Sequence, residues 1–150
     1  MKADKNLNPD FKEFLALLLE EKVEFALIGG YAVAYHGYPR FTGDMDILVA
    51  RSPANASKVL KVLGRFGFGN LQISNADLET EGNVIQLGFP PVRIDLITSI
   101  DGVDNSEIFA GLIEGGFYGL NLPIISKEHL IRNKRATGRT RDLLDLENLE

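Results

Sequence analysis

The segment Leu27-Ile28-Gly29-Gly30-Tyr31 and the later segment Gly43-Asp44-Met45-Asp46-Ile47 decide the fold of this chain. Residues 25–28 form a short apolar run that ends at the two glycines, which is typical of a buried strand followed by a sharp turn. Residues 45–50 form a second apolar run that only Asp46 interrupts, and they predict a second strand. If the glycines and the acids belong to one site, the second strand begins where the first ends. The two strands are therefore predicted to be antiparallel.

Three aspartates lie in or beside these apolar runs. Side chains two residues apart on a strand share a face, so Asp44 and Asp46 project together, and Asp95 lies inside a later apolar run. Unpaired carboxylates are costly to bury, and a divalent cation would neutralise all three. Carboxylate oxygens suit Mg²⁺ or Mn²⁺, and Mg²⁺ often completes its shell with water and substrate phosphate. The structural alternative is that Arg40 or Arg93 pairs with these acids.

Gly29 and Gly30 offer a surface for phosphate. A glycine-rich turn that opens a helix presents bare backbone N–H groups and the positive end of the helix dipole. A dinucleotide-binding fold also begins this way, with an acid about 20 residues later that holds a ribose. That alternative is disfavoured, because the glycines do not follow the G-x-G-x-x-G pattern. In addition, Asp44 and Asp46 precede their apolar run, whereas a ribose-binding acid belongs at the carboxyl end of a strand.

The rest of the chain is predicted to mix helices and strands. Apolar residues at helical spacing predict helices, and runs rich in β-branched residues predict strands. The predicted helices span 9–22, 31–36, 53–66, 105–113, 127–136 and 142–149, and the further strands 84–89 and 92–98 precede a hairpin within 116–125. We therefore predict an α/β (α+β) chain with one mixed sheet flanked by helices. It should form a single domain over residues 1–150, with a core over about 9–125 and a basic helical tail over about 126–150.

Composition narrows the chemistry further. The chain has 150 residues, a formal net charge of -5 and no cysteine, which excludes a thiolate nucleophile and a Cys-ligated zinc site. Neither a signal-peptide pattern nor an apolar run of ~18 residues occurs, so we expect a cytoplasmic protein without a membrane span. Six of the sixteen basic residues lie within 126–141, where Glu128 is the only acid. This excess suits a triphosphate or an RNA end. The structural alternative is a solvated helix face with a weak Arg141–Asp145 pair.

Together these motifs resemble the DNA-polymerase-beta-like nucleotidyltransferase superfamily, in which a Gly-Gly or Gly-Ser turn precedes an Asp-x-Asp pair and a third Asp on a neighbouring strand. The abortive-infection and toxin-type branch of minimal nucleotidyltransferases is resembled by two further segments, Arg40-Phe41-Thr42-Gly43-Asp44-Met45-Asp46 and the tail with Lys134, Arg139, Arg141, Asp142 and Asp145. The resemblance implies a nucleotidyltransferase fold. It also implies transfer of a nucleoside monophosphate from a nucleoside triphosphate to a hydroxyl group, with release of pyrophosphate.

The resemblance also implies roles for individual residues. Asp44, Asp46 and Asp95 would hold two Mg²⁺ or Mn²⁺ ions, and Asp95 is the best candidate to help deprotonate the acceptor. The implied nucleotide contacts are Gly29, Gly30, Tyr31, Arg40 and Lys134. For Tyr31 and Arg40 the structural roles, packing and pairing with acids, stay open.

The nucleotide base and the acceptor are not encoded in these motifs. A protein, a tRNA or a small molecule could receive the nucleotide, a role in a toxin–antitoxin pair is compatible with the resemblance, and the apolar tail helix could support a homodimer. The rival hypothesis is a catalytically silent module that binds a nucleotide or a partner protein in such a pair. Nucleotide binding that needs both a divalent metal and the Asp44/Asp46 pair distinguishes the first hypothesis from partner binding alone.

Overall fold

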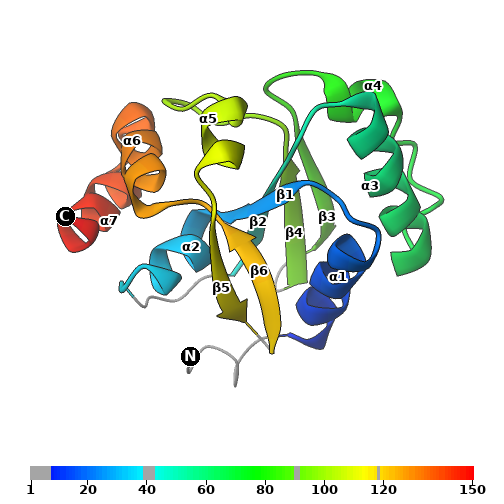
Figure 1. The fold of residues 1–150 in the computed structure, drawn as a ribbon, viewed down its shortest axis with the longest axis horizontal. Helices are drawn as coiled ribbons and strands as arrows, with labels where there is room; N and C mark the ends of the chain where they lie inside the picture. Colours follow the sequence, from blue (N-terminus) through cyan, green and yellow to red (C-terminus); the bar gives the residue numbers. More distant parts are fainter. Residues whose placement is uncertain (1–7, 39–42, 90–91, 118) are drawn as a thin grey trace.

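The computed structural model describes residues 8–38, 43–89, 92–117 and 119–150, and Figure 1 shows their arrangement. In chain order the elements are α1 (Pro9–Glu20), β1 (Phe25–Ile28), α2 (Gly29–Tyr35), β2 (Met45–Val49), α3 (Pro53–Phe66), α4 (Asn75–Glu79), β3 (Val84–Phe89), β4 (Val92–Ile97), α5 (Asn105–Ala110), β5 (Ile113–Phe117), β6 (Leu120–Ile124), α6 (Lys127–Thr137) and α7 (Thr140–Leu149). Helices and strands are therefore mixed along the chain, as predicted.

The strands form one mixed sheet of six, in the order β3-β4-β2-β1-β6-β5. The pairs β1/β2, β3/β4 and β5/β6 are antiparallel, and the pairs β2/β4 and β1/β6 are parallel. Helices α1, α3 and α4 lie to one side of the sheet, and α2, α6 and α7 lie to the other (Figure 1). The predicted mixed sheet, its antiparallel first strand pair and the helical tail are confirmed.

The centre of the sheet is buried almost completely. All four residues of β1 are buried, and within β2 only Asp46 is partly exposed. Helix α1 packs against α3 and β4, and the side chains of its Phe14, Leu15 and Leu18 are fully buried. Strands buried on both faces have continuous apolar sequences. A carboxylate in the middle of such a strand therefore needs a specific explanation.

Local capping signals explain which helix boundaries were predicted well. Helix α3 begins after Ser52, whose hydroxyl accepts a hydrogen bond from the Asn55 N–H at 3.1 Å, and it ends at Gly67 with φ +101°. Helix α2 differs from the prediction, because it begins at Gly29 rather than at Tyr31. The five residues of α4 were not predicted, since one helical turn is too short to show periodicity.

Within the described ranges, no helix combines the length and the apolar character that crossing a membrane requires.

Candidate functional site

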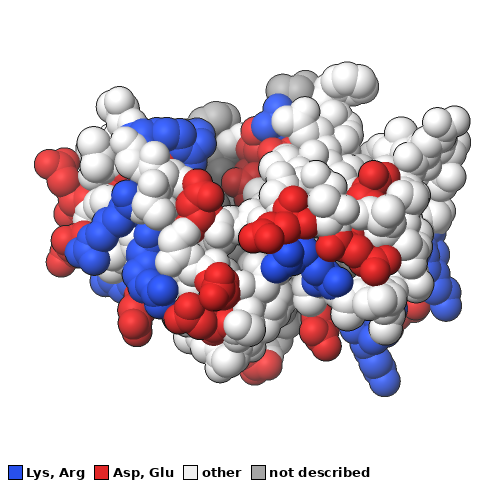
Figure 2. All heavy atoms as spheres, turned by 90° about the horizontal axis from the view of Figure 1, so that it is seen from above, with Lys and Arg blue, Asp and Glu red and all other residues white. Residues whose placement is uncertain are grey.

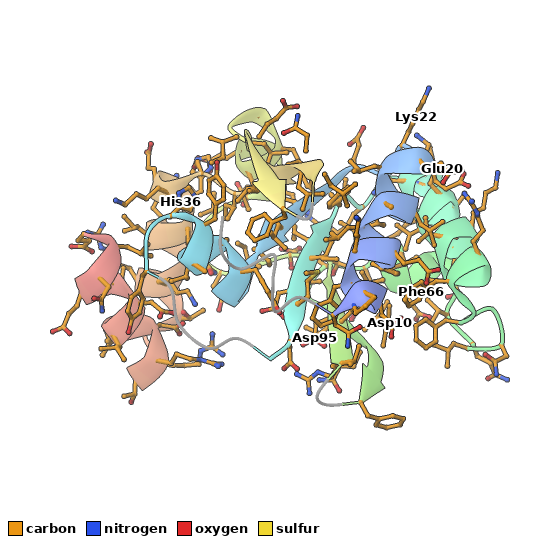
Figure 3. All side chains as sticks on the ribbon, turned by 90° about the horizontal axis from the view of Figure 1, so that it is seen from below. Asp10, Glu20, Lys22, His36, Phe66 and Asp95 are labelled. Atoms are coloured by element: carbon orange, nitrogen blue, oxygen red, sulfur yellow. The ribbon has the colours of Figure 1, made fainter. Side chains whose placement is uncertain are left out.

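The sheet brings the three predicted aspartates together. Asp46 on β2 is the register partner of Asp95 on the parallel strand β4, and Asp44 directly precedes β2. On its other side Asp46 is the register partner of Ile28, the last residue before the two glycines. A cavity of about 720 Å³ is lined by all three aspartates and by both glycines. Figure 3 labels Asp95 at this site.

Gly29 is required by its backbone and by its neighbour. Its φ of +68° lies in the left-handed region, which costs L-residues free energy. A Cβ atom placed on Gly29 would collide with the carboxylate of Asp46. The close approach of this backbone to an acid means that a side chain at position 29 and the present position of Asp46 are sterically incompatible.

Replacing Gly29 with alanine should therefore destabilise the protein by about 2–4 kcal/mol and displace Asp46. The matched control is Gly82→Ala, because Gly82 has a similar φ of +81° but nothing within 4 Å of an added Cβ. Backbone strain alone predicts a loss of about 1 kcal/mol for the control. Urea unfolding of both variants measures the difference, and equal losses would show that contact with Asp46 contributes nothing.

Arg93 neutralises two of the three acids. Its Nε and Nη2 donate hydrogen bonds to the two carboxylate oxygens of Asp95 at 3.0 and 3.2 Å, and Nη2 also donates to Oδ2 of Asp44 at 2.6 Å. The hydrogen bond with Asp95 raises the pKa of Arg93, so its guanidinium stays charged. The predicted structural alternative, pairing of these acids with Arg93, is thus present in the structure.

Asp46 has no such compensation. Its carboxylate forms no hydrogen bond with any described residue, and burial, followed by the charges of Asp95 and Asp44, raises its pKa to about 6. The more distant charges of Lys134 and Arg141 oppose this shift. A buried carboxylate beside two others marks the place where an additional positive charge would be most favourable.

The donor set suits a hard divalent cation in its chemistry. All three side chains supply carboxylate oxygens, the ligands that Mg²⁺ and Mn²⁺ prefer, and among the described residues only the distant charges of Lys134 and Arg141 act against the charge of Asp46. The geometry is not preassembled, because no group of three or more acidic, His or Cys side chains in the described ranges is arranged to hold a metal ion. Arg93 holds Asp44 and Asp95 instead. The three predicted metal ligands therefore line one cavity, but Arg93 already forms ion pairs with two of them.

Basic side chains form the opposite wall of the cavity. The lining residues from α6, α7 and their connection are Asn133, Lys134, Ala136, Thr137, Arg139 and Arg141. Figure 2 shows basic side chains gathered on the part of the molecule that contains α6 and α7, next to a hollow whose other wall carries acidic side chains. The predicted basic tail thus faces the predicted acids across one cavity.

Lys134 lines the cavity, but its ammonium is held by two buried aspartates. Its Nζ lies 3.1 Å from Oδ1 of Asp142 and 3.1 Å from Oδ2 of Asp145, and both aspartate side chains are fully buried. The structural alternative, a weak surface pair between Arg141 and Asp145, does not describe this tail, because the side chain of Asp145 is fully buried. Contact of Lys134 with a nucleotide stays a prediction.

The remaining predicted contacts lie elsewhere or outside the described ranges. Tyr31 is buried, packs edge-to-face on Phe11 with ring centroids 6.1 Å apart, and is not among the described residues that line the cavity. Burial, followed by the charge of Asp44, raises the pKa of its phenol. Arg40 lies outside the residues that the structure describes.

The sequence did not reveal the loop after β4 as part of this site. Ser99, Ile100 and Asp101 line the cavity, and the Asn133 side chain fixes this loop to α6 by donating to the Asp101 carbonyl at 2.9 Å. The only sequence signal is the position of the loop directly after the strand that carries Asp95. The contact with α6 joins residues far apart in the chain, and no local pattern reports it.

The sequence matches no protein-family model and none of the curated proteins. Solved structures, in contrast, match over nearly the whole chain. A candidate nucleotidyltransferase from Thermotoga maritima superposes with a TM-score of 0.63 at 18% identity, covering 91% of this chain and 88% of that one. The antibiotic-resistance factor ANT(2'')-Ia gives 0.63 at 15% identity, covering 97% and 83%. The lincomycin-bound lincosamide antibiotic adenylyltransferase LnuA gives 0.57 at 18% identity, covering 95% and 96%.

These likenesses define the class of the fold. The chain has the nucleotidyltransferase fold. The two glycines and the three aspartates, which the sequence motifs predicted to meet, line one cavity of this fold.

Proposed function

We propose that the protein is a metal-dependent nucleotidyltransferase that uses a nucleoside triphosphate as donor. The observation that carries the proposal is the composition of one cavity. Three aspartates and a Gly-Gly turn line one wall, and basic residues of α6 and α7 line the other. A triphosphate is a chain of anions that needs cations along its length, and the same cavity offers arginines and the carboxylates that bind divalent metals.

The proposed residue roles follow from the placement of each group. Asp44, Asp46 and Asp95 would hold Mg²⁺ or Mn²⁺, and we propose two ions. These ions would stabilise the negative charge on the attacking and leaving oxygens. Gly29 and Gly30 carry no side chain of their own that would keep a phosphate from their backbone, although the carboxylate of Asp46 lies against Gly29. Arg141 lines the same cavity, and we assign it to the charge of the leaving pyrophosphate.

The proposed reaction is balanced without a further reactant. The acceptor hydroxyl oxygen forms a bond to the α-phosphorus, the bond from that phosphorus to the β-phosphate oxygen breaks, and pyrophosphate leaves. The hydroxyl proton passes to a carboxylate, for which Asp95 is the candidate. In the structure each oxygen of Asp95 accepts one hydrogen bond from Arg93, which leaves a second lone pair on each oxygen for the proton.

For the acceptor we propose a small hydroxyl-bearing molecule as the first class to test. Support comes from two similar structures, one of an antibiotic-resistance factor and one of an adenylyltransferase bound to lincomycin. A protein or tRNA acceptor, and with it the toxin-type role, is the alternative that the tail motif suggested. Neither choice alters the proposed roles of the acids.

The function is tested by incubating the protein with each nucleoside triphosphate, Mg²⁺ or Mn²⁺, and panels of hydroxyl-bearing antibiotics, tRNA and proteins. We expect pyrophosphate release that requires one triphosphate, one acceptor and the metal, and that stops on chelation. Calorimetric titration of each triphosphate with metal provides the second readout. Metal-dependent binding without any product would favour the silent nucleotide-binding module, and no binding at all would favour a partner-binding role.

A further inference from the structure

One guanidinium lies between two of the proposed metal ligands. Arg93 precedes Asp95 by two residues on β4, so both side chains leave the same face of the strand. The guanidinium contacts both oxygens of Asp95 and also reaches Asp44 at 2.6 Å. The side chains are sheltered, with exposed fractions of 25% for Arg93, 10% for Asp95 and 35% for Asp44. This is a fork between two carboxylates and not a loose surface pair.

A divalent cation and this guanidinium compete for the same carboxylate oxygens. A Mg²⁺ ion binds its oxygen ligands at about 2.0–2.1 Å, whereas N–H groups of Arg93 already occupy both oxygens of Asp95 and one of Asp44. Like charges a few ångströms apart repel each other, most strongly where solvent is partly excluded. The two cations therefore cannot both hold Asp44 and Asp95 at full strength.

Asp46 shows that the ion-pair network is incomplete. Arg93 forms hydrogen bonds with the acids on either side of it in the cavity, but not with Asp46 itself. Of the three acids Asp95 is the most buried, and it is the one whose two oxygens both accept hydrogen bonds from Arg93. Asp46, the second residue of β2 and its only partly exposed one, forms no ion pair with a described Lys or Arg, so its negative charge is left for another cation.

We propose that Arg93 is an internal counter-ion that keeps Asp44 and Asp95 paired in the metal-free protein, and that a divalent cation binds by displacing its guanidinium. This inference rests on the proposed function, because it assigns these acids to the metal. It follows that Arg93 weakens the binding of free metal. In the metal-free protein its hydrogen bonds also hold the carboxylates of Asp44 and Asp95 in position.

The test is a calorimetric titration of Mn²⁺ into the nucleotide-free protein and its variants. Arg93→Gln should bind Mn²⁺ about tenfold or more tightly than the wild type, because a competing positive charge is removed. Arg93→Lys should shift the affinity in the same direction by less, since a lysine keeps the charge but loses the planar fork.

The matched control is Arg65→Gln. Arg65 also bridges two carboxylates, Glu21 at 2.7 Å and Glu20 at 3.1 Å, and it is not among the residues that line the cavity. This control removes the same formal charge from the protein and should leave Mn²⁺ affinity unchanged. Adding Asp44→Asn to Arg93→Gln should remove the gain, which places the bound Mn²⁺ at these acids.

The outcomes separate this inference from the proposed function. Equal or weaker Mn²⁺ binding by both Arg93 variants would overturn the inference, while metal-dependent transfer by the wild type would keep the function. Tighter binding by Arg93→Gln without transfer to any acceptor would support the inference and count against the function. Thermal melting checks that each variant is folded, and if Arg93→Gln does not fold, Arg93→Lys alone decides. No Mn²⁺ binding by any of these proteins would overturn both the inference and the metal dependence.

Discussion

Replacing Asp46 with asparagine should abolish nucleotidyl transfer and, at the same time, stabilise the protein at neutral pH. Transfer should fall by about 10³-fold or more, because asparagine removes the negative charge that a divalent cation needs at the centre of the site. Stability should rise because the Asp46 charge is unfavourable in the metal-free protein, where burial and two neighbouring carboxylates raise its pKa to about 6.

The raised pKa of Asp46 determines in which direction the stability of the wild type changes with pH. An acid whose pKa is higher in the folded than in the unfolded protein adds stability at low pH, and that stability is lost as pH rises through the folded pKa. The wild type should therefore lose stability between about pH 4 and pH 7, by up to about 3 kcal/mol for a shift of about 2 pKa units. Asp46→Asn cannot ionise, so its stability should stay above that of the wild type across the upper part of this range.

The measurement is urea unfolding at pH 4, 6 and 8, combined with the pyrophosphate assay. Asp101→Asn is the control, because Asp101 is an exposed acid that also lines the cavity. We expect little change in stability for the control. An Asp46→Asn protein that is less stable than the wild type at pH 8 would contradict the electrostatic account. Full transfer activity in the same variant would show that the site is assigned wrongly.

Much of the fold could be predicted because the decisive signals are local. A strand buried on both faces is a continuous apolar run, so β1 and β2 stand out, and Asp46 stands out within β2 as the one polar residue. The antiparallel pairing of these strands followed from requiring Gly29 and Asp46 to meet. The collision between an added Cβ on Gly29 and Asp46 supports the same juxtaposition.

The electrostatic partners could not be predicted in the same way, because they depend on which side chains the packing brings together. Arg93 was one of two candidate partners for the acids, and the structure shows its fork with Asp95 and Asp44. The basic tail was expected to be either a phosphate-binding surface or a solvated helix face. Its central lysine lines the cavity but is also buried between two aspartates, a contact made by the packing of α6 against α7 that neither expectation included.

Replacing Lys134 with methionine should destabilise the protein by about 3–5 kcal/mol, the usual cost of leaving a buried ion pair without one partner. The side chain of Lys134 is 6% exposed, and its ammonium is 3.1 Å from oxygens of both Asp142 and Asp145, whose side chains are 0% exposed. Methionine fills a similar volume, so the loss reports mainly the charge. For a chain of this length the melting temperature should fall by roughly 6–20 °C.

The pH dependence of this loss identifies its cause. Burial favours the neutral form of Asp142, but hydrogen bonds from Arg139, Thr137 and Lys134 outweigh it and hold the pKa of Asp142 well below its usual range. An acid with a lowered pKa adds stability above its unfolded pKa and loses it as pH falls through the folded value. Without the ammonium the carboxylate of Asp142 protonates more easily, so the deficit of Lys134→Met relative to the wild type should shrink as pH falls towards 4.

The control for this variant is Lys127→Met, which removes the same charge from an exposed position in the first turn of α6. Its stability should stay within about 0.5 kcal/mol of the wild type, as for most surface substitutions. The comparison also separates the two roles considered for Lys134. If Lys134→Met is as stable as Lys127→Met but binds nucleoside triphosphate much more weakly, its ammonium serves the nucleotide. If it is strongly destabilised, and if below its lower melting temperature it still binds the nucleotide, Lys134 positions α7 and Arg141 without touching the phosphates.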